Sequence, residues 1–336
     1  MGRYGLKDWD AAVTALAQAS RVAIACHVNP DGDALGALFA ASIGLRSLGI
    51  ATFPSWGSAP ASIPPSYAFL PGAAELVQPA DMPETDVFLA LDCGAGDRLG
   101  DLESVARAAS VSINVDHHPG NDLFGTLNLV APKASSTAEL TAFLLRDLGV
   151  FFDRDIATCL YTGLVTDTGR FSYSNTSPET LRIAADLFEY DVPATLIAQE
   201  VFESAPFGYL KLVGRVLDRA VLAAEERFVY SWVTTADLIE TGVAMDETEK
   251  LIDAVRATSA AEVAAVFKEQ ADGSFRVSLR SKGVSVGEIA RERGGGGHDL
   301  AAGYTARDVD GAVGDIRAAL RTARGDGAAV ERKDAG

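Results

Sequence analysis

The stretch CHVNPDGDALG at residues 26–36 places a histidine, an asparagine and two aspartates directly after the apolar run VAIA at 22–25. Polar side chains at the end of a buried strand are typical of a parallel sheet, in which ligands bind beyond the carboxyl ends of the strands. Asp31 and Asp33 would also suit a turn followed by a helix N-cap, so this stretch alone leaves both interpretations open. Polar groups of the same kind recur at Asp92, at the triplet Asp116-His117-His118 and at Asp167.

Short apolar strands alternate with helical segments through the first part of the chain. Strands are predicted at 22–26, 87–91 and 111–115, and helices at 33–48 and 137–148. This alternation predicts an α/β fold with a parallel sheet covered on both faces. Two helix starts have recognisable caps, because Ser136 and Glu139 have the spacing of a capping box and Ser177 precedes Pro178. No element is assigned to 160–165, just before Asp167.

The pattern changes after residue 190, first to a helical stretch and then to strands of a different character. The new strands are predicted at 228–234, 262–269 and 274–280, and the last two form a hairpin around ADG. We therefore expect two α/β domains with the active site in the cleft between them. The expected boundaries are a first domain at 1–190, a helical linker at 191–221, a smaller second domain at 222–324 and a disordered tail at 325–336.

Composition and charge narrow the class of protein. The 336 residues are 48% apolar and 22% charged, and 29 basic against 46 acidic residues give a net charge of −17. Such a charge disfavours binding of long duplex nucleic acid, so a nucleic-acid ligand should be short. The three cysteines form no CxxC pair, which indicates buried free thiols. We expect a cytoplasmic protein, since no apolar run is long enough for a membrane span and the start has no secretory signal.

Histidines and aspartates concentrate in the strand-end motifs. The chain has four histidines, and three of them fall in two of these motifs. Carboxylates brought to one point repel one another unless cations neutralise them. We therefore predict two divalent cations, with ligands that favour Mn²⁺ and also suit Mg²⁺ or Co²⁺, rather than zinc. The residues expected near this centre are His27, Asp31, Asp33, Asp92, Asp116, His117 and Asp167.

Four motifs resemble those of the DHH phosphoesterases. They are HVNPDGDALG, LDCGAGDRLG, VDHHPGN and VTDTGRFSYSNTSPET, in that order, and the similarity spans about 15–305. GGGGH, with VSLRSK before it and AAGY after it, resembles the substrate-binding signature of the DHH-associated C-terminal domain. The length and two-domain layout are similar to the NrnA-like branch, which includes nano-RNases, pAp phosphatases and phosphodiesterases of cyclic di-AMP or pApA.

The resemblance implies a role for each matching residue. His27 and Asp31 would hold one metal, Asp33, His117 and Asp167 the other, and Asp92 would bridge them. Asp116 would orient a ligand histidine, and His118 would face the phosphate and assist the leaving oxygen, so both join Asp92 as expected catalytic residues. The implied substrate contacts in the second domain are Arg280, Ser281, Gly295, Gly296, Gly297 and His298.

The implied function is hydrolysis of short oligoribonucleotides, pApA, pAp and cyclic di-AMP to nucleoside 5′-monophosphates. Two cations can lower the pKa of a water between them and so supply a hydroxide, without a protein nucleophile. The resemblance also implies a homodimer, and we expect no membrane partner. Two alternatives stay open, a nucleotide-binding sensor without catalysis and a hydrolase of polyphosphate or pyrophosphate.

Overall fold

The computed structural model describes residues 3–330, with side chains from 4 to 323. The chain divides into two compact units, Met1–Ser204 and Ala205–Gly336, here called unit 1 and unit 2. The predicted linker at 191–221 is shared between them, because α7 (Ala194–Ala198) lies in unit 1 and α8 (Phe207–Asp218) in unit 2. Helix α8 buries Leu212 and Val216 in a hydrophobic cluster with strands of unit 2, and so forms part of that core.

Unit 1 contains a parallel five-stranded sheet, which confirms the predicted fold class. Its strands, in the order β2-β1-β3-β4-β5, are β1 (Arg21–Cys26), β2 (Ala51–Trp56), β3 (Val87–Leu91), β4 (Val111–Asp116) and β5 (Leu127–Val130). The two edge strands were not predicted. Pro54 interrupts the β pattern of β2, which an edge strand tolerates, and β5 is only four residues long.

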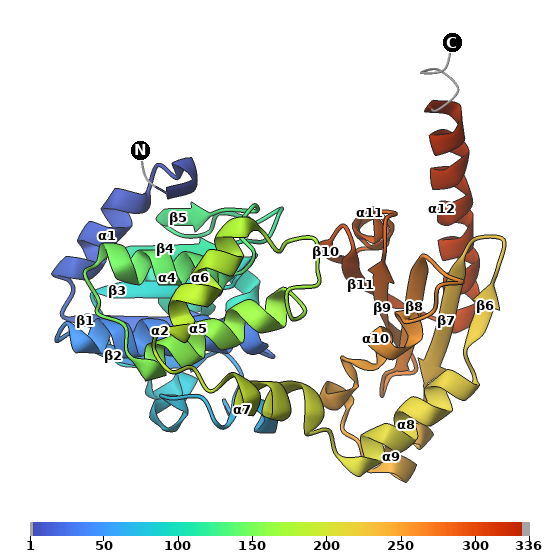
Figure 1. Ribbon diagram of the computed structural model, residues 1–336, viewed down its shortest axis with the longest axis horizontal. Helices are drawn as coiled ribbons and strands as arrows, with labels where there is room; N and C mark the ends of the chain where they lie inside the picture. Colours follow the sequence, from blue (N-terminus) through green and yellow to red (C-terminus); the bar gives the residue numbers. More distant parts are fainter. Residues whose placement is uncertain (1–2, 331–336) are drawn as a thin grey trace. The chain divides into compact units, whose positions relative to one another are not determined.

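Both faces of this sheet are covered, as predicted, and Figure 1 shows the helices on one of them. Val22 and Ile24 pack in one hydrophobic cluster with α2 and its neighbours, whereas Ala23 and Ala25 pack in another against η5 (Gly96–Leu102) and α3 (Glu103–Ala108). The three cysteines are buried and free. The other helices of unit 1 are η1 (Arg3–Gly5), α1 (Trp9–Gln18), α2 (Gly32–Ser47), α4 (Thr137–Asp147), α5 (Arg154–Asp167), α6 (Pro178–Phe188) and the short turns η2 (Pro65–Tyr67), η3 (Ala73–Glu75), η4 (Pro79–Asp81) and η6 (Gln199–Glu203).

The predicted cap at Ser177 is confirmed in full, and the predicted capping box at Ser136 is confirmed in part. The Ser136 side chain accepts a hydrogen bond from the Glu139 amide, but the reciprocal half of the capping box is missing. Glu139 is fully buried and its carboxylate accepts instead from the Ser135 and Thr180 hydroxyls, at 2.6 and 3.0 Å. At α6, Ser177 forms a complete capping box with Thr180.

Helices α2 and α5 pack against each other through glycines. A Cβ atom on Gly36 would collide with the Cys159 carbonyl, and one on Gly163 would lie 2.9 Å from Asp33 Oδ1. The absence of side chains there lets the start of α2, with Asp33, approach the end of α5, with Asp167. Residues 160–165, left unassigned from the sequence, form the middle of α5.

Replacement of Gly36 by alanine is expected to destabilise unit 1 by about 1–3 kcal/mol, because the added methyl group meets backbone atoms that cannot rotate away. It should also weaken manganese binding, since α2 and α5 would move apart. Gly314→Ala is the matched control, because nothing lies within 4 Å of a Cβ at that helical position. Thermal unfolding and manganese titration measure both effects, and equal behaviour of the two variants would contradict the prediction.

Unit 2 is built on a mixed six-stranded sheet in the order β10-β11-β9-β8-β7-β6. The predicted hairpin is confirmed by the antiparallel pairing of β8 with β9. One face of the sheet packs against α11 and α12 and the other against α8 and α10. The remaining elements are β6 (Val221–Ala223), β7 (Phe228–Val233), α9 (Thr235–Thr241), η7 (Met245–Thr248), α10 (Leu251–Arg256), β8 (Val263–Glu269), β9 (Phe275–Ser281), α11 (Val286–Arg291), β10 (Gly296–His298), β11 (Ala301–Ala306) and α12 (Val309–Val330).

Two details of unit 2 differ from the sequence-based expectations. The glycine loop at 295–297 is partly a strand, because Gly296 and Gly297 pair with β11. The backbone of 325–330 continues α12, where disorder was expected, since an existing helix gains one hydrogen bond for each residue added. The rest of the predicted tail lies outside the described residues. No helix between residues 3 and 330 has the length and apolar character needed to cross a membrane.

Candidate metal centre

The stretch at residues 26–36 provides both the N-cap of a helix and a buried carboxylate. Asp31 is the N-cap of α2, and its Oδ1 accepts hydrogen bonds from the amides of Asp33 and Ala34 at 3.0 and 3.1 Å. The Asp33 side chain is only 1% exposed. Its two oxygens accept from the Thr137 and Ala138 amides at 2.6 and 2.8 Å, at the start of α4. The turn interpretation therefore holds for Asp31, while Asp33 points into the interior.

Asp92 lies at the centre of the acidic and histidine cluster. Its Oδ2 is 3.5 Å from Nε2 of His27, and its Oδ1 is 3.7 Å from Nε2 of His117. Three groups of three residues share it, and within each group the candidate ligand atoms lie within 4.8 Å of one another. Two of them contain only predicted metal ligands and are here called the two ligand groups: His27 with Asp31 and Asp92, and Asp33 with Asp92 and His117. The third consists of Asp92, Asp116 and His118.

Asp167 and Asp116 complete the cluster from two other elements. Asp167, the last residue of α5, places Oδ2 3.7 Å from Nε2 of His117. Asp116, the last residue of β4, is fully buried and its Oδ1 lies 2.7 Å from Nδ1 of His118. His118 is more exposed than these carboxylates, with a side-chain exposure of 34%. All seven residues predicted near the centre, with His118, therefore lie together in unit 1.

The carboxylates of the cluster differ in how readily they hold a proton: the pKa of Asp92 is lowered, whereas those of Asp33 and Asp167 are raised. Burial alone would raise the pKa of Asp92, but the imidazoles of His27, His118 and His117 hold it well below its usual range. Burial and the charge of Asp92 raise the pKa of Asp33, and burial raises the pKa of Asp167 to about 7. Without bound cations, Asp33 and Asp167 therefore tend to stay protonated, so that the cluster does not carry three negative charges at once.

Several polar groups that the sequence analysis did not identify hold these residues in place. Thr137 Oγ1 donates to Asp92 Oδ1 at 2.9 Å, and the Asn175 amide group donates to Asp167 Oδ2 at 3.2 Å. Asn121 donates to Asp116 Oδ2 at 2.6 Å, and Arg98 places Nη2 2.9 Å from His27 Nδ1. Arg98, Asn121 and Asn175 lie in motifs that carry an aspartate or histidine, which is their only signal in the sequence, whereas Thr137 lies outside all four motifs.

The backbone of Asp92 is strained in a way that suits a functional site. Asp92 follows β3 with φ of 60°, in the left-handed region that a non-glycine residue rarely adopts. Such conformations persist where the surroundings enforce them, and they cluster at active sites. Here the Asp92 amide donates to the Val115 carbonyl at 3.0 Å and the Thr137 hydroxyl holds the side chain.

The chemistry of this donor set fits two divalent cations. Carboxylate oxygens dominate, with imidazole nitrogens among them, and such sets suit Mn²⁺ and Mg²⁺. The two groups share one carboxylate, and the carboxylates repel one another without cations. Outer polar partners fix Asp33, Asp92 and Asp167, as is usual around metal ligands.

Comparison with known proteins agrees with this geometry. The model of the DHH family, N-terminal domain, matches residues 21–164, and that of the DHHA1 domain matches 225–324. The chain is 34% identical over 289 residues to the bifunctional oligoribonuclease and PAP phosphatase NrnA of Thermus thermophilus, covering 85% of this chain and 84% of that protein. This chain belongs to the DHH family. NrnA of Bacillus subtilis is 29% identical and covers 86% of this chain and 91% of its own length.

Solved structures share the fold of this DHH-family chain. An exopolyphosphatase-related protein from Bacteroides fragilis superposes with a TM-score of 0.85 at 24% identity, covering 93% of this chain and 95% of that one. RecJ of Thermus thermophilus, crystallised with Mn²⁺, gives a TM-score of 0.58 at 15% identity, covering 95% of this chain and 55% of RecJ.

The DHHA1 part of the chain brings some of the predicted substrate residues together. Ala301 of β11 pairs with His298 on one side and with Arg280 on the other, so the three share one row and one face of the sheet. Ser281 points to the opposite face, where it is 1% exposed and its hydroxyl accepts from the Gly283 amide. The structure therefore does not place the Ser281 side chain with Arg280.

The predicted glycines have different surroundings. A Cβ on Gly295 would collide with the Gly303 carbonyl, and Gly297 has φ of 123°, so both positions require glycine for the fold itself. At Gly296 nothing lies within 4 Å of a Cβ. Of the three, Gly296 is therefore the position at which the described residues leave free space beside the backbone.

Replacement of Thr137 by valine is expected to weaken manganese binding by about 10- to 100-fold, since it removes the hydrogen bond that orients Asp92 while keeping the shape of the side chain. Thr141→Val is the matched control, because the Thr141 hydroxyl is buried in the same helix and has no hydrogen-bond partner among the described residues. Calorimetric titration with Mn²⁺ measures both. Equal affinities in the two variants would show that the Thr137 hydroxyl does not position Asp92.

Proposed function

We propose that this chain hydrolyses short oligoribonucleotides, pApA and pAp, and also cyclic di-AMP, to nucleoside 5′-monophosphates with two divalent cations. The chain is a phosphoric ester hydrolase, as its family and its NrnA relatives show. The observation that carries the finer proposal is the pair of ligand groups that share Asp92. NrnA relatives carry the names oligoribonuclease and PAP phosphatase, which supports short RNA and pAp as substrates.

The proposed ligands are the residues of the cluster. His27 and Asp31 would hold one cation, Asp33, His117 and Asp167 the other, and Asp92 both. Two bound cations supply Lewis-acid activation of water and neutralise the charge that develops on the phosphate. The proposed metal is Mn²⁺. The structure of RecJ with Mn²⁺, which has the same fold, and the oxygen-rich ligands support this choice.

His118 is the proposed general acid. Burial opposes its charged form, but the hydrogen bond to Asp116 and the charge of Asp92 raise the pKa of His118 to about 9. Nδ1 faces Asp116, so Nε2 carries the proton available to a leaving oxygen. Cations bound at Asp92 would lower this pKa towards neutral, where a general acid is most effective. Asp116 acts through His118, by fixing its orientation and its tautomer.

Arg280 is the proposed anchor for the part of the substrate that is not cleaved. A guanidinium group grips phosphate oxygens at two points, and His298 lies in the same row of the sheet. Arg280→Ala is expected to raise KM for pApA by about tenfold or more with little change in kcat, because uniform binding is lost. Ser281→Ala serves as the control and should leave KM unchanged. A fall in kcat with constant KM for Arg280→Ala would contradict the anchoring role.

The test of the proposed function is a product assay. The purified chain with Mn²⁺ is given pAp, pApA, a five-nucleotide RNA, cyclic di-AMP and polyphosphate in parallel. The products are separated by chromatography, and binding of each compound is measured by calorimetry. Formation of AMP supports the proposal, and the ratios of kcat/KM rank the substrates. Hydrolysis of polyphosphate alone would favour the phosphoanhydride alternative, and binding without any product would favour the sensor. The homodimer implied by the family resemblance stays a prediction.

A further inference from the structure

The imidazole of His27 has two polar neighbours at the same ring nitrogen. Nδ1 lies 2.9 Å from the carbonyl oxygen of Val28 and 2.9 Å from Nη2 of Arg98. A guanidinium nitrogen is always a donor and a carbonyl oxygen is always an acceptor, so Nδ1 can satisfy only one of the two at a time. With a proton on Nδ1 the ring donates to Val28, and without that proton the ring accepts from Arg98.

A cation at His27 would select between these two partners. His27 would bind it through Nε2, the nitrogen that lies 3.5 Å from Oδ2 of Asp92. A neutral imidazole that binds a metal through Nε2 carries its proton on Nδ1, and here that proton is donated to the Val28 carbonyl. In this tautomer Arg98 would face another donor, so its guanidinium group needs a different acceptor.

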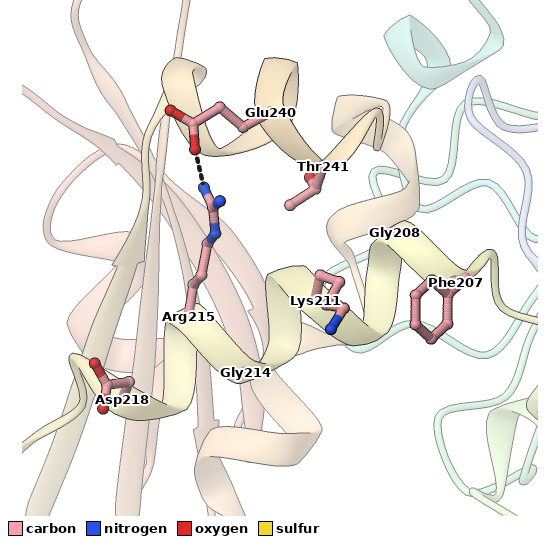
Figure 2. A pocket seen from close by; sticks show the side chains of 8 residues that line it. All are labelled: Phe207, Gly208, Lys211, Gly214, Arg215, Asp218, Glu240 and Thr241. Atoms are coloured by element: carbon pink, nitrogen blue, oxygen red, sulfur yellow. Dashed lines mark ion pairs between the residues drawn. The ribbon is translucent and has the colours of Figure 1, made fainter.

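The described part of the chain offers Arg98 no carboxylate as that acceptor. Other arginines have one, since Arg107 pairs with Glu103 at 2.6 Å and Arg215 pairs with Glu240 at 2.6 Å, as Figure 2 shows for the second pair. Arg98 forms no ion pair with a carboxylate of residues 4–323, and its neighbour is an imidazole. A permanent positive charge beside a site for divalent cations opposes their binding, and an anion from outside the chain would offset it.

The backbone of Arg98 is fixed, and its side chain lies where a ligand can arrive. The Val28 amide donates to the Arg98 carbonyl at 2.9 Å, and a Cβ on Gly57 would collide with the carbonyl that follows Arg98, so this turn is locked against the segments after β1 and β2. Arg98 is exposed, as is the side chain of Asp31, whose Oδ1 lies 4.0 Å from Nε2 of His27. The two charged groups therefore lie at opposite nitrogens of one imidazole, on the side of the centre that solvent reaches.

We propose that Arg98 binds the phosphate group that the chain hydrolyses. This inference rests on the proposed function, because it requires a cation at His27. A guanidinium group donates to two phosphate oxygens at once, with a fixed geometry that a lysine lacks. A water oxygen bonds to phosphorus while the ester oxygen leaves with the proton of His118, and Arg98 would stabilise the negative charge that develops on the remaining oxygens. Arg98 is then a catalytic residue, in contrast to Arg280, which anchors the part of the substrate that is not cleaved.

The first test measures hydrolysis of pApA with Mn²⁺. Arg98→Gln is expected to lower kcat by about 100-fold or more, as does the loss of one donor to a developing oxyanion, and Arg98→Lys should recover part of the loss. Arg107→Gln is the matched control and should stay within twofold of the wild type, because Arg107 is an exposed arginine of α3 that pairs with Glu103. A wild-type kcat in Arg98→Gln would overturn the inference. Absence of product from the wild type would overturn the proposed function instead, and the second test would still decide the role of Arg98.

The second test measures binding without turnover. AMP carries the phosphate group that hydrolysis releases, and calorimetry on the manganese-loaded protein should give a Kd for AMP about tenfold higher in Arg98→Gln, because a charged hydrogen-bond donor is lost. Manganese affinity should equal or exceed that of the wild type, since a neighbouring cation has been removed. A residue that only held His27 in place would give the opposite result, with weaker manganese binding and an unchanged Kd for AMP, and that result would overturn the proposal. Circular dichroism checks that the variants fold.

Discussion

Replacement of Asp92 by asparagine is expected to reduce turnover to background while the fold is kept. Asp92 belongs to both ligand groups, so one change removes a charged oxygen from each. The loss of an outer partner of a metal ligand already costs about 10- to 100-fold, and loss of a shared ligand should exceed about 100-fold in both manganese affinity and kcat. Alanine at this position should have the same effect on turnover. Steady-state kinetics and manganese titration on the same preparation measure it.

Asp101→Ala provides the control for this experiment. Asp101 lies in η5, the element that follows β3 and Asp92 in the chain, but it is exposed and outside both ligand groups. Its replacement should leave metal content and kcat unchanged. Full turnover by a metal-loaded Asp92→Asn or Asp92→Ala enzyme would refute the proposed bridging role and would also weaken the assignment of the two groups to two cations.

Manganese affinity is expected to rise steeply with pH between 6 and 7. Burial raises the pKa of Asp167 to about 7, and it raises the pKa of Asp33 as well, so protons must leave before cations can bind. Below the pKa of the ligand, each proton that the metal must displace makes the affinity rise about tenfold for every unit of pH. Above that pKa the ligand is already ionised, and the affinity no longer depends on pH. Calorimetry in buffers of different ionisation enthalpy counts the protons released.

The same ionisation makes the metal-free protein less stable as pH rises. A carboxyl group whose pKa is higher in the folded state than in the unfolded state contributes stability below the unfolded pKa, and this contribution is lost as pH rises through the folded pKa. For Asp167 the loss extends up to about pH 7. The chelator-treated protein should therefore have a lower Tm at pH 8 than at pH 6, and manganese should raise Tm more at pH 8.

Asp167→Asn should reduce this pH dependence, because it removes one ionising group from the cluster. Thermal unfolding at the two pH values, with and without manganese, provides the measurement. If manganese raised Tm equally at pH 6 and pH 8, protons would not compete with the cation, and the assignment of Asp167 as a ligand would fail.

Much of the candidate site could be predicted from the sequence, because its main residues follow buried strands. The strands before His27, Asp92 and Asp116 are short and apolar, and a parallel sheet brings their ends together. Asp167 was found through its motif alone, since the middle of α5 looks equally apolar in a strand or a helix. The two edge strands were not predicted, because their partial exposure and Pro54 in β2 weaken the apolar pattern that marks a buried strand.

The supporting contacts could not be predicted from residue types. Thr137 contributes an amide to Asp33 and a hydroxyl to Asp92, and its residue type gives no indication of either. The orientation of Ser281 relative to Arg280 could not be predicted from the motif either. Ser281 is adjacent to Arg280, but successive residues of a strand point to opposite faces, and the family motif does not indicate which face meets the substrate.

The unequal burial of the two ligand groups has a consequence for metal loading. Asp33 is enclosed and held by two backbone amides, whereas the Asp31 side chain is 60% exposed at the surface. A cation on the Asp33 side would thus be trapped behind fixed oxygens, and one on the Asp31 side would meet bulk water. Of two cations bound there, we expect the one on the Asp33 side to exchange slowly and the one on the Asp31 side rapidly, so that the free metal concentration around the protein would set how often both are present.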